Sequence, residues 1–365
     1  MTARRISRQI AVGKVKIGGG APVSVQSMTN TKTADAVATL EQIRRLAQAG
    51  CDIVRLSVDN ASDAARLPEI TSGSPLPVVA DIQFDYRSAL LALEGGVAAL
   101  RLNPGLVNDG EALRQVAEAA LEHGAAIRVG ANSGSVRPQL LRAKLERGMA
   151  FESAMAELLV ESVLEQCRAL EKFGFSQIKA ALKSSSVAVT VEANRIFAER
   201  TDYPLHLGIT EAGLPENGIV KSAVGIGSML LSGIGDTIRV SLTADPVEEV
   251  IAAHRILRAC GLDRQSAEVV ACPTCGRTEI NLPELADKVQ RLIDRLGGKL
   301  GNVRKVAVMG CPVNGPGEAR EADFGLAGSR TGQVIVFRRG EVIGAFSQAE
   351  GLAKLEELMI NAQKE

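Results

Sequence analysis

Short apolar runs rich in β-branched residues alternate, over the first two thirds of the chain, with stretches in which apolar residues recur every three or four positions. The runs predict buried strands, and the periodic stretches predict amphipathic helices. Continuous apolar strands joined by helices are typical of parallel β/α units. The predicted strands are Pro22–Met28, Ile53–Val58, Pro77–Ile82, Ala98–Asn103, Ala126–Ala131, Gln177–Leu182, Leu205–Thr210 and Thr237–Leu242.

Strands of this number and kind predict a closed (β/α)8 barrel of the TIM type, for which about 250 residues is the usual size. The longest insertion, Arg137–Phe175, follows the fifth strand and predicts two helices, and Ile6–Ile17 predicts a hairpin before the barrel. The other predicted helices are Asp35–Ala49, Arg87–Glu94, Gly110–His123, Ala188–Arg200, Ile219–Leu231 and Val247–Cys260.

The last third of the chain has a different pattern. Residues 261–268 are polar and predict a linker, and the segment beyond them predicts a small α+β layer. We therefore expect a barrel domain over residues 1–260 and an α+β domain over residues 269–365. The expected elements of the second domain are a strand that leads into Cys272, helix Leu282–Leu296, strand Lys305–Met309, a hairpin over Val334–Phe346 and helix Ala349–Gln363.

Composition excludes several classes of partner. The chain has 42 Lys and Arg against 42 Asp and Glu, so its net charge is zero and no nucleic-acid partner is expected. The absence of Trp, with only two Tyr, also argues against a base-stacking platform. No apolar run predicts a membrane span, and the N-terminus leads into no apolar segment of a signal peptide. We therefore expect no membrane association and a cytoplasmic location.

Charged and amide side chains follow the predicted strands at their carboxyl ends, where barrels carry their active sites. Gathering like charges at one mouth is costly, so we expect a polyanionic ligand, because Arg recognises phosphate in a bidentate way and Lys adds a point charge. The alternative is that some of these cations form structural ion pairs with Asp81, Glu211 or Asp236, but this cannot easily absorb all of them. The candidate ligands of a diphosphate are Arg55, Arg101, Arg128, Lys183 and Arg239, with Asn103 and Asn132 as neutral donors.

Two further residues belong to this hypothesis. Lys221 comes near the start of the predicted seventh barrel helix, and a helix N-terminus attracts anions. Glu211 follows the seventh predicted strand and is our candidate for proton transfer or for binding a substrate hydroxyl group. Its alternative role is a salt bridge to one of the cations.

The second domain contains a cysteine pattern with its own chemistry. Cys272-Pro-Thr-Cys275 is followed by Cys311 and, seven residues later, by Glu318. Three thiolates plus a weaker fourth ligand suit an iron–sulfur cluster with one labile iron. Structural zinc stays open, although it prefers four nitrogen or sulfur ligands and the three histidines lie outside this segment. A redox-active pair also stays open.

Long stretches of the chain resemble the bacterial 4-hydroxy-3-methylbut-2-enyl diphosphate synthase family of the non-mevalonate isoprenoid pathway, in its two-domain form. Two positions depart from the usual pattern of the family: Gln83 stands where His is usual, and Leu106 where Asn is usual. The first departure leaves the role of position 83 open. The matching stretches are Val25–Asn30, Ala80–Arg87, Arg101–Gly105, Arg128–Asn132, His206–Gly213, Asp236–Leu242, Ala271–Cys275 and Gly310–Ala319.

The resemblance implies an oxidoreductase that opens the ring of 2-C-methyl-D-erythritol 2,4-cyclodiphosphate reductively, with loss of water. It implies one 4Fe–4S cluster per chain, which Cys272, Cys275, Cys311 and Glu318 would hold, and flavodoxin or ferredoxin as the electron donor. Two other classes stay open from the residues alone: a redox-inactive barrel lyase or transferase with structural zinc, and a cluster carrier without enzymatic activity. The cationic mouth argues against a carrier, which needs no phosphate pocket.

The length of the linker bears on assembly. The last barrel helix should descend roughly 20 Å from the active face, and eight extended linker residues span at most about 26 Å. This is too short to climb around a barrel and set Cys272 over its own mouth. We therefore expect a homodimer in which each cluster domain caps the partner's barrel, and the resemblance implies the same head-to-tail arrangement. The rival is a monomer in which the last helix partly unfolds.

Overall fold

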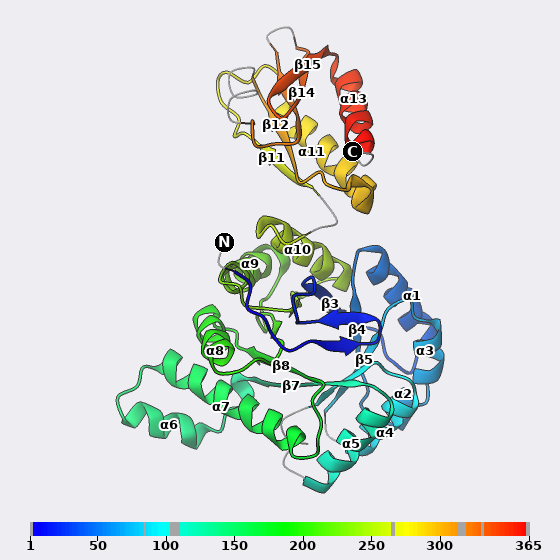
Figure 1. The fold of residues 1–365 in the computed structure, drawn as a ribbon, viewed down its shortest axis with the longest axis vertical. Coiled ribbons are helices and arrows are strands. Elements are labelled where there is room, and N and C mark those ends of the chain that lie inside the picture. Colours follow the sequence, from blue (N-terminus) through cyan, green and yellow to red (C-terminus); the bar gives the residue numbers. More distant parts are fainter. Residues whose placement is uncertain are drawn as a thin grey trace. The chain divides into compact units, whose positions relative to one another are not determined.

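The computed structural model describes residues 3–83, 85–102, 110–263, 267–311, 319–329 and 332–362. The chain divides into two compact units, Met1–Cys260 and Gly261–Glu365 (Figure 1). Each unit has its own sheet and its own core, and they are described separately below.

The first unit is a parallel barrel, as predicted. Its strands hydrogen-bond in the order β8-β7-β6-β5-β4-β3-β10-β9, and a parallel bridge between Ala180 and Leu205 joins the two ends of this order. The last two strands are shorter than the sequence predicted. The strands are β3 (Ser24–Met28), β4 (Ile53–Ser57), β5 (Val78–Ile82), β6 (Ala99–Leu102), β7 (Ala126–Asn132), β8 (Ile178–Lys183), β9 (His206–Leu207) and β10 (Thr237–Ile238).

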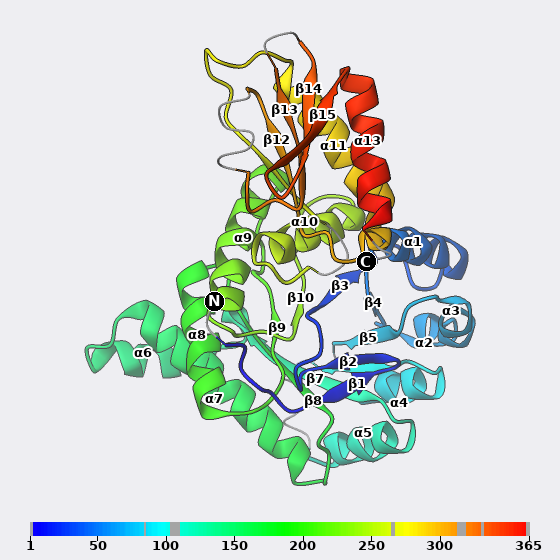
Figure 2. The same cartoon turned by 45° about the horizontal axis from the view of Figure 1, so that its top comes forward.

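Helices surround the strands of the barrel in both views (Figures 1 and 2). The insertion after β7 forms two helices, as predicted, and the first of them, α6, projects from the ring with no buried residue. Two short helices, α2 and α3, were missed. The helices are α1 (Ala36–Gln48), α2 (Ala61–Ala64), α3 (Leu67–Gly73), α4 (Tyr86–Glu94), α5 (Gly110–Glu122), α6 (Pro138–Glu146), α7 (Phe151–Glu171), α8 (Val187–Arg200), α9 (Pro215–Leu231) and α10 (Pro246–Ala259).

An N-terminal hairpin packs against one end of the barrel interior. Strands β1 (Ile10–Val12) and β2 (Val15–Ile17) pair antiparallel around Gly13, whose φ of +54° suits a glycine in a tight turn. The buried hairpin residues pack against the first inward-facing residues of β4 to β7, which are Ile53, Val79, Ala99 and Ala126. This half of the barrel therefore has an apolar floor.

The second unit is an α+β layer with a mixed five-stranded sheet. Strands β11 (Glu268–Ala271), β12 (Lys305–Met309) and β13 (Phe324–Gly328) are parallel, and β14 (Val334–Arg338) and β15 (Glu341–Phe346) continue the sheet antiparallel. Helices α11 (Leu282–Leu296) and α13 (Gln348–Asn361) contribute to the core on one face. Strand β13 was not predicted, because its run Phe-Gly-Leu-Ala-Gly lacks β-branched residues.

None of the helices in the described part of the chain combines the length and apolar character that a membrane span requires. The cytoplasmic location stays a prediction.

Candidate functional site

The alternation of side chains along the barrel strands builds a charged layer above the apolar floor. In β4 to β7 the residue two positions after each floor residue faces the same side, since side chains alternate along a strand. Those residues are Arg55, Asp81, Arg101 and Arg128. Asp81 pairs with Arg101, and Arg101 with Arg128, in the register of neighbouring strands. The carboxyl-end arginines predicted from the sequence therefore meet inside the barrel.

Two carboxylates hold three of the five predicted cations. Asp81 forms ion pairs with Arg101 (Nη1 to Oδ1, 3.0 Å) and Arg55 (Nε to Oδ2, 3.6 Å). Glu249, in the first turn of α10, pairs with Arg239 (Nε to Oε2, 3.2 Å). The structural ion-pair alternative thus applies to these three arginines. Glu249 was missed, although it lies on the buried face of its helix with Pro246 and Val250.

Arg128 and Lys183 have no carboxylate partner among the described residues. Arg128 is only 6% exposed, and its Nε has no hydrogen-bond partner in that part of the chain. Burial and the charges of Arg55 and Arg101 hold the pKa of Arg128 well below its ordinary value. Burial and the neighbouring arginines Arg128 and Arg239 lower the pKa of Lys183 in the same way. Buried cations without a counter-charge are costly, so this layer suits an anionic ligand.

The remaining residues predicted at the barrel mouth are Asn132, Asn103 and Lys221. Asn132 ends β7, is exposed, and pairs in register with Lys183. Its backbone N–H donates to Ser135 Oγ (3.0 Å). Asn103 lies outside the described residues. Lys221 lies in the second turn of α9, which begins at Pro215, so the prediction that it sits near a helix N-terminus was wrong.

Glu211 has an unusual backbone conformation. It lies in the loop between β9 and α9 with φ of +53°, in the left-handed region that residues other than glycine rarely adopt. Its side chain is exposed, and no ion pair to it occurs in the described part of the chain. Backbone strain of this kind concentrates at functional sites. The conformation is therefore consistent with the predicted role in binding or proton transfer.

Two ionisable groups inside the barrel were not predicted as site residues. Lys179 in β8 is 2% exposed and pairs in register with Arg128. Burial, with the charges of Arg128 and Arg55, lowers the pKa of Lys179 to about 7. His206 in β9 is fully buried, and burial and the charge of Lys183 hold its pKa well below the ordinary value. The alternation in Gln177–Leu182 could have revealed Lys179, because it shares the inward face of β8 with Lys183.

In the second unit, two of the predicted cluster ligands lie at one edge of the sheet. Cys272 follows β11 and Cys311 follows the adjacent parallel strand β12. The backbone N–H of Gly310 donates to Cys272 Sγ (3.2 Å), and Cys311 is buried. Hydrogen bonds to sulfur are a feature of iron–sulfur sites.

Of the other two predicted cluster ligands, Cys275 and Glu318, the structure describes only Cys275. Cys275 is exposed, and hydrogen bonds from Arg277 lower its pKa, which favours the thiolate that binds metals. Glu318 lies outside the described residues. Within the described ranges, no three His, Cys, Asp or Glu side chains meet closely enough to hold a metal ion, and the six cysteines form no disulfide.

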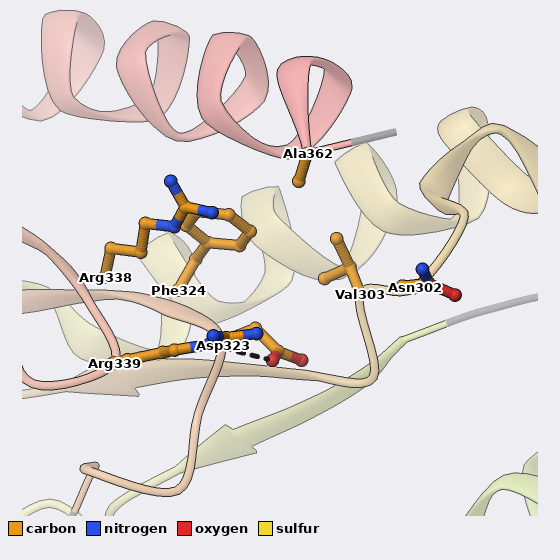
Figure 3. Close-up of a pocket in the computed structure, with 7 residues that line it drawn as sticks. All are labelled: Asn302, Val303, Asp323, Phe324, Arg338, Arg339 and Ala362. Carbon is orange, nitrogen blue, oxygen red and sulfur yellow. Dashed lines mark ion pairs between the residues drawn. The ribbon is translucent and has the colours of Figure 1, made fainter. Parts of the chain in front are cut away.

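A separate cavity of about 300 Å³ lies in the second unit (Figure 3). Residues that precede β12 and β13, such as Val303 and Asp323, line it, so it opens at the sheet edge opposite to Cys272 and Cys311. Asp323 pairs there with Arg339 (4.0 Å), and the Arg338 guanidinium lies 5.6 Å from the centre of the Phe324 ring. None of the candidate site residues lines this cavity.

Comparisons with known proteins cover both units. Residues 7–254 match the family described as GcpE TIM-barrel domain, and residues 268–361 match the GcpE protein C-terminal domain. The chain is 49% identical to the 4-hydroxy-3-methylbut-2-en-1-yl diphosphate synthase (flavodoxin) of Aquifex aeolicus, over 100% of this chain and 99% of that protein. It is 50% identical to the protein of the same description from Geobacter sulfurreducens, over 94% of each.

Among solved structures, the chain is similar to a truncated 3-deoxy-D-arabino-heptulosonate 7-phosphate synthase from Thermotoga maritima. The TM-score is 0.50 at 12% identity, over 70% of this chain and 94% of that chain. At this identity the similarity shows the barrel fold alone.

Proposed function

The chain belongs to the GcpE family of 4-hydroxy-3-methylbut-2-en-1-yl diphosphate synthases, and from this premise we propose which of its residues bind the substrate and which hold the redox cofactor. The enzyme is an oxidoreductase of the non-mevalonate isoprenoid pathway. Its reaction is the reductive ring opening and dehydration of 2-C-methyl-D-erythritol 2,4-cyclodiphosphate.

The barrel mouth is the proposed binding site of the cyclic diphosphate. The observation that carries this proposal is the pair of buried cations, Arg128 and Lys183, that lack a carboxylate partner in the described part of the chain. The two negative charges of the substrate would supply the missing counter-charge. Arg55, Arg101 and Arg239 add positive charge beside them while Asp81 and Glu249 hold their guanidinium groups in place. Asn103 and Asn132 would donate neutral hydrogen bonds.

These cations also have a role in the chemistry. Ring opening leaves additional negative charge on the diphosphate, and fixed positive groups in a site with little water stabilise such charge strongly. Glu211 is the proposed group that binds a substrate hydroxyl or moves a proton near the reacting carbons, since it follows β9 in a strained conformation. Lys221 stays among the proposed diphosphate-binding residues only as a positive charge on α9, the helix that follows β9.

The second unit is the proposed site of one 4Fe–4S cluster per chain. Its donors fit such a group in kind: Cys272 and Cys311 follow adjacent parallel strands, hydrogen bonds from Arg277 lower the pKa of Cys275, and Glu318 would be the fourth ligand. When bound, the cluster would supply single electrons and a Lewis-acidic iron. The relatives named above are flavodoxin enzymes by description, which favours flavodoxin over ferredoxin as the electron donor here.

A head-to-tail homodimer is the proposed assembly. Helix α10 has 14 residues and is therefore about 21 Å long. It begins close to the carboxyl end of β10 and must return along the outside of the barrel before the chain reaches residue 261. The short connection to β11 then favours a cluster domain that caps the partner's barrel.

Product analysis tests the activity and metal analysis tests the cofactor. Anaerobically purified, reduced protein incubated with the cyclodiphosphate should yield (E)-4-hydroxy-3-methylbut-2-enyl diphosphate. Iron and acid-labile sulfide should each approach about four per chain, as one 4Fe–4S cluster requires. Stoichiometric zinc without sulfide would refute the cluster assignment and leave the phosphate-binding mouth untouched.

A further inference from the structure

One half of the barrel interior is polar rather than apolar. In β4 to β7 the floor residues are apolar, but β3, β9 and β10 carry Ser24, Gln26, His206 and Thr237 on their inward faces. Thr237 pairs in register with both Ser24 and His206, so these three side chains occupy one layer. Gln26 is two residues further along β3 and two residues before Met28, whose Sδ accepts hydrogen bonds from Arg55. A barrel interior is normally filled by branched apolar side chains.

The polar atoms of this layer lack partners. All four residues are at most 4% exposed. The hydroxyls of Ser24 and Thr237, both ends of the Gln26 amide and both ring nitrogens of His206 have no hydrogen-bond partner among the described residues. Buried polar groups are nearly always hydrogen-bonded. A cluster of buried polar atoms without protein partners is therefore typical of a site for ordered water.

Lys179 lies on β8, which borders this polar layer on the β9 side. Its neighbours are Arg128 on β7, Arg55 on β4, Lys183 on its own strand and Asp236 before β10. The carboxylate of Asp236 is already engaged, because it accepts hydrogen bonds from Ser7 Oγ (2.8 Å) and the Leu205 N–H (2.9 Å) and pairs with Arg4 (3.1 Å). His206, on β9, stays neutral because burial lowers its pKa. Lys179, with a pKa of about 7, is therefore a group beside this layer that can change charge near neutral pH.

We propose that Lys179, beside the polar layer of Ser24, Gln26, His206 and Thr237, takes up a proton when a diphosphate binds at the barrel mouth. The proposal rests on the proposed substrate site and adds a positioning residue beneath it. Lys179 lies four residues before Lys183, about 13 Å along the strand, so it supports the ligand by charge rather than by contact. The proton would remain inside the site for a reaction that releases one substrate oxygen as water.

The size of the effect follows from Coulomb's law. Each negative charge about 13 Å away, at an effective dielectric constant of about 20, raises the pKa of Lys179 by roughly one unit. The two charges of the cyclodiphosphate therefore raise the pKa of Lys179 from about 7 to about 9. Uptake by Lys179 is then about 0.8 proton at pH 8 and less than about 0.1 at pH 6. Since binding favours the protonated form, affinity falls by about 25-fold between pH 7 and pH 9.

Calorimetry measures this uptake directly. The oxidised holoenzyme, without reductant, is titrated with the cyclodiphosphate in buffers of different ionisation enthalpy, at pH 6 and pH 8. Both phosphates of this ligand are esterified and share the bridging oxygen, so the ligand itself does not titrate in this range. The dependence of the binding heat on buffer enthalpy gives the number of protons taken up.

Three proteins separate the possible results. Lys179→Met should take up about 0.8 proton fewer than the wild type at pH 8, whereas Lys172→Met, an exposed lysine of the same unit, should match the wild type. Equal uptake by Lys179→Met and wild type would place the proton on another group and overturn the proposal. If Lys179→Met does not fold, the wild type still tests the proposal. A wild-type protein that takes up no proton at pH 8 on binding the ligand contradicts it. Absence of any binding heat in the wild type would instead refute the substrate site.

Discussion

Replacing Lys179 by Met should stabilise the barrel, and the gain should depend on pH. Lys179 has a pKa of about 7 in the fold, against an ordinary value of 10.5. Between these values the unfolded chain binds more protons than the folded one, so the free energy of unfolding rises with pH. The destabilisation by Lys179 is fully present below pH 7 and is lost above the pKa that Lys179 has in the unfolded chain. Met has no titrating group, so its advantage is largest at low pH.

The pKa difference sets the magnitude. One pKa unit corresponds to about 1.4 kcal/mol. The titration of Lys179 therefore makes the free energy of unfolding of Lys179→Met higher than that of the wild type by about 4 kcal/mol at pH 7 and about 2 kcal/mol at pH 9. The absolute advantage also contains the packing of the Met side chain. The change of about 2 kcal/mol between pH 7 and pH 9 does not, because packing is independent of pH.

Urea denaturation followed by tyrosine fluorescence tests this prediction. The chain has no Trp, and its two tyrosines, Tyr86 and Tyr203, both belong to the barrel unit, so the signal reports barrel unfolding. Lys172→Met is the matched control and should show no pH-dependent advantage. A Met advantage at position 179 that is the same at pH 7 and pH 9 would refute the reasoning, because Lys179 would then not titrate between those values.

Three further predictions concern the proposed mouth and cluster. Arg128→Ala should raise the dissociation constant of the cyclodiphosphate by roughly one to two decades, since a charge-assisted contact is worth about 1.5–3 kcal/mol. The visible spectrum of the cluster should be unchanged, and the exposed Arg168→Ala control should bind normally; unaltered binding by Arg128→Ala would count against the phosphate site. Cys311→Ser should lose iron and sulfide, whereas Glu318→Ala should keep much of both and lose turnover; loss of the whole cluster in Glu318→Ala would give this residue a structural role. Mixed dimers of Arg128→Ala and Cys311→Ser chains should regain activity, because one unmutated barrel then faces one unmutated cluster domain; verified mixed dimers that stay inactive would exclude a shared site.

The sequence determined the architecture because its signals are local. Apolar runs such as Val78–Ile82 separated by amphipathic stretches permit few packings other than parallel β/α units, and the barrel formed as predicted. The arginines at the strand ends were also predictable, because parallel strands bring their carboxyl ends to one face. The positions of Cys272 and Cys311 after adjacent strands were predictable in the same way, and their role as cluster ligands stays a prediction. Short elements such as α2 were missed because they carry too little periodicity.

Tertiary structure alone decided how the charges are balanced. Glu249 is ten residues from Arg239, and Asp81 is twenty from Arg101, and no local pattern shows that each carboxylate holds its arginine. Asp81 and Glu249 pair with other arginines, and Arg128 and Lys183 are left without a carboxylate partner within the described residues. The environment of Lys179 likewise depends on strands that meet only when the barrel closes. A sequence names the ionisable groups, but burial and the distances between charges set their pKa values, and both arise from the closed fold.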